Sequence, residues 1–159
     1  MDKSLKVRNV REQDAALLRR MAAACPPLDL HTPYTYWVNA KYFGEYSFLV
    51  CEGEKIIGYI MCIKNDKQLL IWQIGILKEY RKKKISKILI ENVLKKAAEN
   101  ALSVNVSIAA ENRDSYGAFK SYCDSSGYIM NAVGEVKLTI DEDPDFIEQE
   151  VLYEIKPLG

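Results

Sequence analysis

The 159-residue sequence has one histidine, His31, and four cysteines, none of them in a Cys-x-x-Cys pair. Without Cys and His at ligand spacing, the sequence does not predict a metal site. A single histidine leaves Ser-His-Asp and Cys-His hydrolases with one candidate base, and His31 is distant in sequence from any nucleophile motif. Because the thiols form no disulfide framework, we expect them to be reduced, as in the cytoplasm.

The sequence also lacks a net charge and a long apolar run. Twenty-two Lys and Arg residues balance 22 Asp and Glu residues, whereas general nucleic-acid binding requires a basic excess. The apolar segments 46–51 and 56–63 are far shorter than the ~20 residues that cross a bilayer, and the charged N-terminus does not resemble a signal peptide. We therefore expect a single domain over residues 1–159, with neither nucleic acid nor membrane as a partner.

Charge is nevertheless distributed unevenly along the chain. Segment 78–87 contains six basic residues and one acid, a net charge of +5, and segment 135–154 contains eight acids and one lysine, a net charge of −7. The first segment could attract a phosphorylated ligand and the second a cation. The alternative interpretation is that both are solvated faces.

Hydrophobic periodicity predicts an α/β fold of the order β-α-(α)-β-β-β-α-β-α-β-β. This order indicates one mixed, mostly antiparallel sheet flanked by helices, with a meander first and crossover helices later. The clearest helix is 84–100, and Thr32 with Pro33 is typical of the start of another helix. Strands are expected at 5–10, 46–51, 55–63, 68–77, 103–109, 128–133 and 149–155, and helices at 11–24, 33–38, 84–100 and 114–124.

The junction between strand 68–77 and helix 84–100 is a candidate anion site. Free N–H groups at the start of a helix and the helix dipole both favour a negatively charged ligand. The basic residues of segment 78–87 add to that attraction. An ordinary strand-to-helix loop is the alternative.

The element order and this junction together resemble the GNAT acetyltransferase superfamily. In that family the junction holds acetyl-CoA through a loop of pattern Arg/Gln-x-x-Gly-x-Gly/Ala, and residues 81–86 here read Arg-Lys-Lys-Lys-Ile-Ser. The arginine and the spacing are retained, but Lys84 and Ser86 replace glycines that let the backbone approach the pyrophosphate. Asn112-x-x-Ser115 resembles the family's Asn-x-x-Ala stretch beside the pantetheine arm. The resemblance implies the GNAT fold, acetyl-CoA as co-substrate without a metal, and a cofactor site of Ile74, Gly75, Ile76, Arg81, Lys82, Lys84, Ile85, Ser86, Lys87, Asn112 and Ser115.

The proton donor departs from the family pattern. Many members have a Tyr seven residues after the Asn, near the leaving thiolate, and this sequence has Phe119 there. Tyr116 and Tyr122 are the substitute candidates, although both could be packed aromatics. Because a thiol with a pKa of ~8.5 leaves readily as a thiolate, the acid is helpful but dispensable. A backbone N–H of strand 74–76, assigned to Ile76, would hold the oxyanion.

Segment 26–38, Pro-Pro-Leu-Asp-Leu-His-Thr-Pro-Tyr-Thr-Tyr-Trp-Val, resembles the N-terminal signature of the diaminobutyrate acetyltransferase family of ectoine biosynthesis. Strand 72–76 and the C-terminal segment 150–158 are also similar to that family, so the resemblance spans nearly the whole chain. It implies a cytoplasmic homodimer that acetylates the γ-amine of L-2,4-diaminobutyrate. It also implies the substrate-binding residues: Asp29 and Glu150 as anchors for the amines, with Tyr34 and Trp72 shaping the pocket. Glu150 could also relay the proton.

Two alternatives remain open. The first is a GNAT enzyme that acts on another small diamine or amino acid. The second is a non-catalytic CoA-binding module, which the residues at positions 84, 86 and 119 suggest because they depart from the family pattern.

Overall fold

A computed structural model describes residues 4–26, 28–82 and 84–159. The strands are β1 (Leu5–Asn9), β2 (Phe48–Glu52), β3 (Lys55–Asn65), β4 (Gln68–Ile76), β5 (Ser103–Ile108), β6 (Tyr128–Ile140) and β7 (Asp143–Pro157). The helices are α1 (Ala15–Ala23), α2 (Pro33–Phe43), α3 (Ile85–Glu99) and α4 (Arg113–Ser126), with short 3-10 turns η1 (Glu12–Asp14), η2 (Gly44–Tyr46) and η3 (Lys78–Tyr80).

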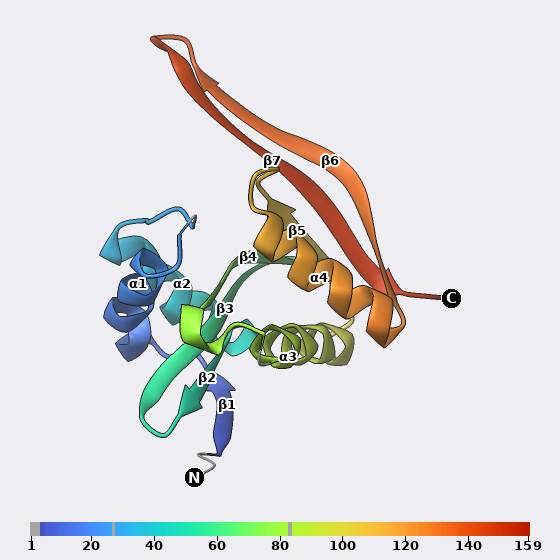
Figure 1. Ribbon diagram of the computed structural model, residues 1–159. Coiled ribbons are helices and arrows are strands. Elements are labelled where there is room, and N and C mark those ends of the chain that lie inside the picture. Colours follow the sequence, from blue (N-terminus) through green and yellow to red (C-terminus); the bar gives the residue numbers. More distant parts are fainter. Residues whose placement is uncertain (1–3, 27, 83) are drawn as a thin grey trace.

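The seven strands form one sheet in the order β1-β2-β3-β4-β5-β7-β6. Within the described residues, β4 and β5 are the parallel pair and the other neighbours are antiparallel. Residues of α1 and α2 pack in one core and residues of α3 and α4 in another (Figure 1). This arrangement confirms the predicted mixed sheet flanked by helices. None of the helices in the described ranges is long and apolar enough to cross a membrane.

Helix boundaries follow the local signals in the sequence. The Thr32 hydroxyl caps α2 by accepting a hydrogen bond from the Thr35 N–H at 3.3 Å, and Pro33 occupies the first turn, as predicted. The helix continues to Phe43, beyond the predicted end at residue 38. Gly127 ends α4 in the left-handed conformation, with φ of 75°, which glycine adopts without steric cost. The start of α2 and the end of α4 are therefore determined by local sequence.

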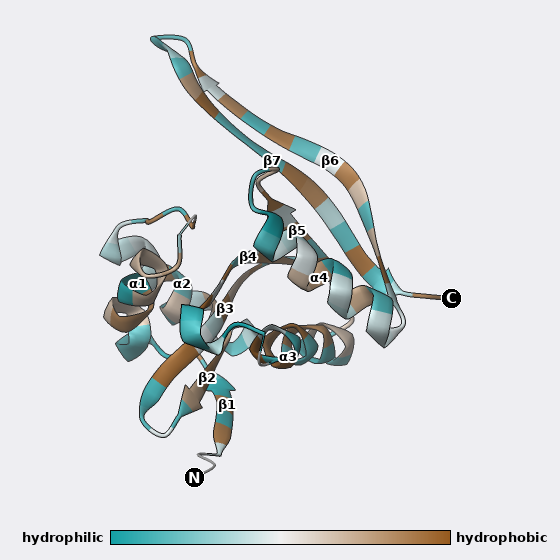
Figure 2. Cartoon of the chain, viewed as in Figure 1, coloured by the Kyte–Doolittle hydropathy of each residue, from teal (hydrophilic) through white to brown (hydrophobic). Residues whose placement is uncertain are grey.

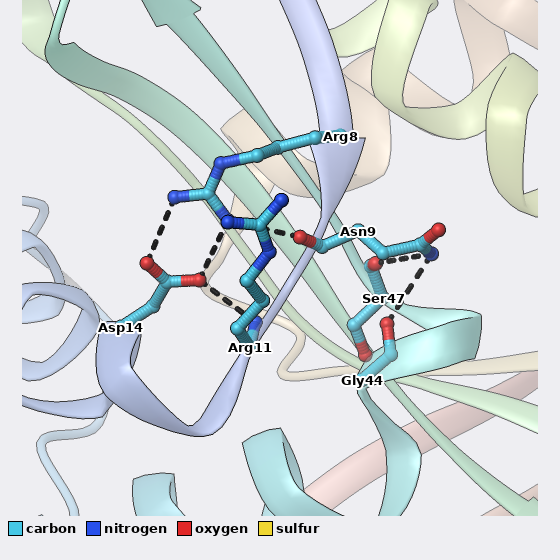
Figure 3. Close-up of polar contacts among 6 residues, drawn as sticks. All are labelled: Arg8, Asn9, Arg11, Asp14, Gly44 and Ser47. Carbon is cyan, nitrogen blue, oxygen red and sulfur yellow. Dashed lines mark hydrogen bonds and ion pairs between the residues drawn. The ribbon is translucent and has the colours of Figure 1, made fainter.

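Polar contacts hold β1 against the first helices (Figure 3). The Arg8 guanidinium donates two hydrogen bonds to the Asp14 carboxylate, at 2.8 and 2.9 Å. Burial alone would raise the pKa of Asp14, but hydrogen bonds from Arg8 and from the Arg11 N–H hold it below its usual value. The Asn9 amide donates to backbone carbonyls of η2, including that of Gly44. A Cβ at Gly44 would lie 2.3 Å from the carbonyl oxygen of Val10, so glycine is required there.

The C-terminal hairpin differs most from the sequence prediction. The pattern predicts strands at 128–133 and 149–155, but β6 and β7 pair from Tyr128↔Pro157 as far as Ile140↔Asp143. The eight acids in this region weaken the strand signal. Alternating apolar side chains and a long backbone ladder nevertheless maintain the pairing, although its register shifts between Ala132 and Gly134 and between Thr139 and Ile140. The far end of the hairpin extends away from the rest of the molecule (Figure 1).

Strands β4 and β5 separate halfway along β4, and this opening positions the site. They pair only where Gln68–Ile71 meets Ser103–Val106. Opposite β3 the register shifts so that Trp72 is an extra residue between Ile71 and Gln73. The bulge changes the phase of side-chain alternation, because Ile71 and Ile74 pack with the α3 core whereas Trp72 packs with the α1–α2 core. Gln73 also faces that second core, where it contacts Tyr36 of α2.

Candidate active site

Two adjacent cavities lie where β4 and β5 separate. The first, which we call the α3 cavity, has a volume of about 410 Å³ and lies at the start of α3. The second, which we call the acidic cavity, has a volume of about 250 Å³ and is lined by the loop before α2, β4, β5 and the hairpin. Both are lined by Leu28, Ile74, Asn112 and Ser115. A ligand in one cavity can therefore reach a ligand in the other.

The α3 cavity brings together nearly all the residues that the sequence assigns to cofactor binding. Lys87 is the exception, since this exposed residue is not among the described residues that line the cavity. Lys83, which belongs to the same loop motif, lies outside the described residues. The lining residues predicted from the sequence are Ile74, Gly75, Ile76, Arg81, Lys82, Lys84, Ile85, Ser86, Asn112 and Ser115.

The loop before α3 keeps a glycine-like backbone without glycine. Lys84 is the N-cap of α3 and has φ of 64° and ψ of 16°, and Lys82 has φ of 65°. Glycine adopts this left-handed region freely, whereas a residue with a Cβ does so at a cost of about 1–2 kcal/mol. Position 84 therefore keeps the conformation that glycine adopts readily and adds a positive charge to the cavity.

The backbone of Ile76 faces the opening between the strands. The Leu77 N–H donates to the Ile57 carbonyl on the β3 side. The carbonyl of Ile76 instead accepts hydrogen bonds from the Cys25 thiol at 3.4 Å and from Arg81 Nε at 3.3 Å, two residues that line the α3 cavity. Because the N–H and C=O of one residue in a strand point to the same side, the Ile76 N–H also points toward the opening. This orientation suits a donor to an oxyanion.

Asn112 and Ser115 form the N-terminal cap of α4. The Asn112 side-chain oxygen accepts a hydrogen bond from the Ser115 N–H at 3.2 Å. Both residues also line the two cavities. The motif thus orients the start of α4 at the boundary between the cavities.

Carboxylates determine the charge of the acidic cavity, because its described lining includes four acids and no lysine or arginine. Asp29 from the loop before α2 and Glu150 from β7 both line it, although 121 residues separate them in sequence. Burial raises the pKa of Glu150, the charges of Asp29 and Glu148 raise it further, and a hydrogen bond with Ser107 opposes them. A half-buried carboxylate with a raised pKa accepts a proton more readily, and the cluster as a whole favours a cationic ligand.

A cluster of carboxylates can also bind a metal ion. Among the described residues, no group of three or more His, Cys, Asp or Glu side chains is arranged to hold a metal ion. The negative charge of the acidic cavity suits a cationic ligand.

Besides Lys87, three predicted site residues lie outside the two cavities. Tyr116 is exposed and packs on Tyr153, with ring centroids 5.7 Å apart. Tyr122 is 6% exposed within the α3 core, and Tyr34 is 70% exposed. None of the three is among the described residues that line the cavities. The rotation of about 100° per residue around α4 turns Phe119, rather than either tyrosine, toward the acidic cavity.

The acidic cavity is also lined by Trp72, which the family resemblance implies for the substrate site, and by His31 and Gln73, which it does not. The His31 ring packs on the Trp72 ring, with centroids 4.9 Å apart. His31 and Gln73 lie in two segments that carry the family resemblance, 26–38 and 72–76. That resemblance was the sequence signal that could have identified them as site residues. Sequence reasoning considered His31 only as a hydrolase base and did not assign Gln73.

Residues 15–123 match the acetyltransferase (GNAT) family. The chain belongs to the GNAT acetyltransferase family. A curated relative, L-2,4-diaminobutyric acid acetyltransferase of Vibrio parahaemolyticus, is 29% identical to this GNAT protein over 142 residues, which cover 85% of this chain and 76% of the relative. The enzyme of the same name from Streptomyces coelicolor is 29% identical over 163 residues, 98% and 94% of the two chains.

Solved structures support the same fold. The diaminobutyrate acetyltransferase of Paenibacillus lautus, in complex with L-2,4-diaminobutyric acid and coenzyme A, superposes with a TM-score of 0.83 at 21% identity, covering 98% of this chain and 96% of that chain. The ribosomal-protein-S18-alanine N-acetyltransferase of Escherichia coli gives a TM-score of 0.75 at 10% identity, covering 98% and 95%. The predicted GNAT fold is confirmed.

Proposed function

We propose that this chain transfers the acetyl group of acetyl-CoA to the γ-amine of L-2,4-diaminobutyrate, an acetylation step of ectoine biosynthesis. The observation that carries the proposal is that Asp29 and Glu150 line the same cavity, and that this cavity adjoins the basic α3 cavity. The names of the curated relatives support the same substrate.

The α3 cavity fits a pyrophosphate-containing ligand. Arg81, Lys82 and Lys84 place positive charge beside the first N–H groups of α3, where the helix dipole also favours an anion. Ile74 and Ile76 supply apolar side chains to the wall of the cavity. The backbone of Ile76 faces the opening between β4 and β5. Acetyl-CoA bound there would supply an acetyl thioester at the boundary with the acidic cavity.

The acidic cavity must hold a diamine and remove one proton from it. An amine with a pKa near 10.4 is neutral in fewer than about one molecule in a thousand at pH 7, so deprotonation costs roughly 4–5 kcal/mol. Glu150, whose pKa is raised by burial and by the neighbouring acids, can accept that proton. Asp29 can pair with the α-ammonium, which leaves the γ-amine free to react. The division of roles between two carboxylates would then determine which nitrogen is acetylated.

The leaving thiolate does not require a tyrosine. Phe119 lines the acidic cavity where many family members have a tyrosine, and a thiol is acidic enough to leave as a thiolate. The chemistry therefore depends on the base and on the backbone donor at Ile76.

We also propose that the enzyme is a cytoplasmic homodimer. The four cysteines are free, in agreement with a reducing compartment. Val136 and Leu138 line the acidic cavity yet remain 37% and 52% exposed. Apolar and polar side chains alternate along the hairpin (Figure 2). A second copy against the hairpin would cover this apolar surface.

The proposed reaction is tested by mixing the purified chain with acetyl-CoA and a panel of amines: L-2,4-diaminobutyrate, ornithine, lysine and 2,3-diaminopropionate. We expect rapid thiol release with diaminobutyrate, and NMR of the product should show the acetyl group on the γ-nitrogen. Release only with another amine would support the alternative acceptor. Binding of acetyl-CoA without release with any amine would support a non-catalytic CoA-binding module.

A further inference from the structure

Gln73 joins the loop that carries Asp29 to the central sheet. Its side-chain nitrogen Nε2 donates a hydrogen bond to the backbone carbonyl of Asp29 at 3.0 Å. Its oxygen Oε1 accepts hydrogen bonds from the hydroxyls of Tyr59 at 2.7 Å and Tyr36 at 3.1 Å. Gln73 is only 7% exposed, so these partners satisfy a buried amide.

The chemistry of the partners determines which way the amide points. A backbone carbonyl can only accept, so the nitrogen of Gln73 must face Asp29 and the oxygen must face the two tyrosines. Burial raises the pKa of both tyrosines, with Tyr59 affected most, and the hydroxyls therefore stay protonated as donors. The three bonds consequently define one arrangement of the loop against the strand.

Two features of the fold bring Gln73 into this position. The bulge at Trp72 turns the next side chain toward α2 rather than α3. Gly75 then leaves room for the Tyr59 ring, since a Cβ at that position would lie 2.6 Å from Tyr59 Cε1. Tyr36 and Tyr59 are both fully buried, so bulk solvent does not reach either hydroxyl.

We propose that Gln73 is a positioning residue for the acetylation reaction, because it fixes Asp29 relative to the strand beside which the acetyl group would lie. The inference rests on the proposed function, in which Asp29 binds the α-ammonium. Ile74, the next residue along β4, lines both cavities. The bond from Gln73 to the Asp29 carbonyl thus determines the separation between the substrate anchor and the reacting thioester.

This role predicts a selective effect on the amine substrate. Asp29 is proposed to bind the α-ammonium, so its displacement would weaken the binding of diaminobutyrate before the chemical step. The hydrogen-bond partners of Gln73 in the described structure are Tyr36, Tyr59 and Asp29. None of them lies in the loop before α3, which would bind the phosphates of acetyl-CoA. Loss of the Asp29 bond should therefore raise KM for diaminobutyrate and leave KM for acetyl-CoA nearly unchanged.

The test compares Gln73→Met with Tyr59→Phe. Gln73→Met keeps the length of the side chain and removes all three hydrogen bonds, whereas Tyr59→Phe disturbs the same buried network but keeps the bond to Asp29. We expect both variants to lower Tm. Only Gln73→Met should raise KM for diaminobutyrate, by about tenfold, with KM for acetyl-CoA within about twofold of wild type. An unchanged KM for diaminobutyrate in Gln73→Met, or an equal rise in Tyr59→Phe, would overturn the inference.

If Gln73→Met does not fold, Gln73→Glu provides the same test. The introduced carboxyl accepts from both tyrosines but donates to the Asp29 carbonyl only when it is protonated. KM for diaminobutyrate, relative to wild type at each pH, should therefore be raised at high pH and recover as pH falls. A ratio near one throughout would overturn the inference.

The wild-type assay separates this inference from the proposed function. Normal acetylation of diaminobutyrate by wild type together with an unaffected Gln73→Met overturns the positioning role alone. Acetylation of a different amine overturns the proposed substrate, and the same variants are then compared with that amine. If wild type acetylates no amine, the proposed function and the positioning role both fail.

Discussion

Asp29 and Glu150 share one cavity but have different surroundings. Asp29 is exposed on an irregular loop, whereas Glu150 is half-buried on β7 with a raised pKa. Two carboxylates in different environments can take different roles, one as a charge partner and the other as a base. At the residue scale, this difference supports the assignment of Asp29 to binding and Glu150 to proton transfer.

Asp29→Asn should reduce kcat/KM for diaminobutyrate by roughly 30- to 150-fold, because a charge-assisted contact contributes about 2–3 kcal/mol. The substitution keeps the shape of the side chain, and the bond from Gln73 goes to the backbone carbonyl rather than to the carboxylate. Tm and the affinity for acetyl-CoA should therefore match wild type in thermal melts and titration calorimetry.

Asp124→Asn is the matched control, because Asp124 pairs with Lys120 and is not among the described residues of either cavity. Its kcat/KM should be close to the wild-type value. Normal turnover in Asp29→Asn combined with a lowered Tm would instead assign Asp29 a purely structural role.

At the scale of a secondary-structure element, the junction between β4 and α3 contributes both positive charge and a left-handed backbone to the α3 cavity. Its lysines supply charge, and its backbone takes the left-handed conformation at Lys82 and Lys84. A search for glycine alone would not identify this loop, although its backbone adopts the left-handed conformation that glycine favours. The α3 dipole and N–H groups depend on that backbone rather than on the side chain.

Lys84→Gly and Lys84→Ala both remove the charge, so their difference reports the backbone alone. With φ of 64° at this position, we expect Lys84→Gly to be about 1 kcal/mol more stable than Lys84→Ala. Urea unfolding measures this difference in the free energy of unfolding. Greater stability of the alanine variant, the usual order inside a helix, would show that residue 84 is not left-handed in solution.

The hairpin gives the whole molecule its asymmetric outline (Figure 1). One of its faces contributes Glu150 and Leu138 to the acidic cavity, while its far end has no covering helix in the described structure. Exposed apolar residues on a long antiparallel ribbon are typical of a protein interface. The proposed homodimer would therefore link assembly to closure of the substrate site.

Leu138→Asp should shift the protein from dimer to monomer in sedimentation velocity, because a charge would be buried against the partner. Leu158→Asp is the control, since Leu158 is 63% exposed near the C-terminus and is not among the described cavity residues. It should leave the sedimentation coefficient unchanged. A wild-type protein that sediments as a monomer at micromolar concentration would contradict the homodimer.

The sequence alone determined the features that depend on neighbouring residues. Thr32 and Pro33 begin α2, Gly127 ends α4, and the apolar stripe of α3 is buried as its periodicity predicts. The element order and the local motifs were enough to indicate the fold and most of the residues that line the α3 cavity. These signals act within a few residues, where capping, periodicity and backbone sterics dominate.

Only the tertiary structure decided that Gln73 and Phe119 join Asp29, Trp72 and Glu150 around the acidic cavity. The bulge at Trp72 reverses the side-chain alternation of β4 and turns Gln73 toward Tyr36 and Tyr59. Helix α4 is oriented so that Phe119 lines the cavity and Tyr116 does not. Neither outcome can be inferred from spacing, because a one-residue change of register moves a side chain to the opposite face of a strand. The physical reason is that packing between distant segments, rather than local propensity, sets the register of the bulge and the rotation of the helix.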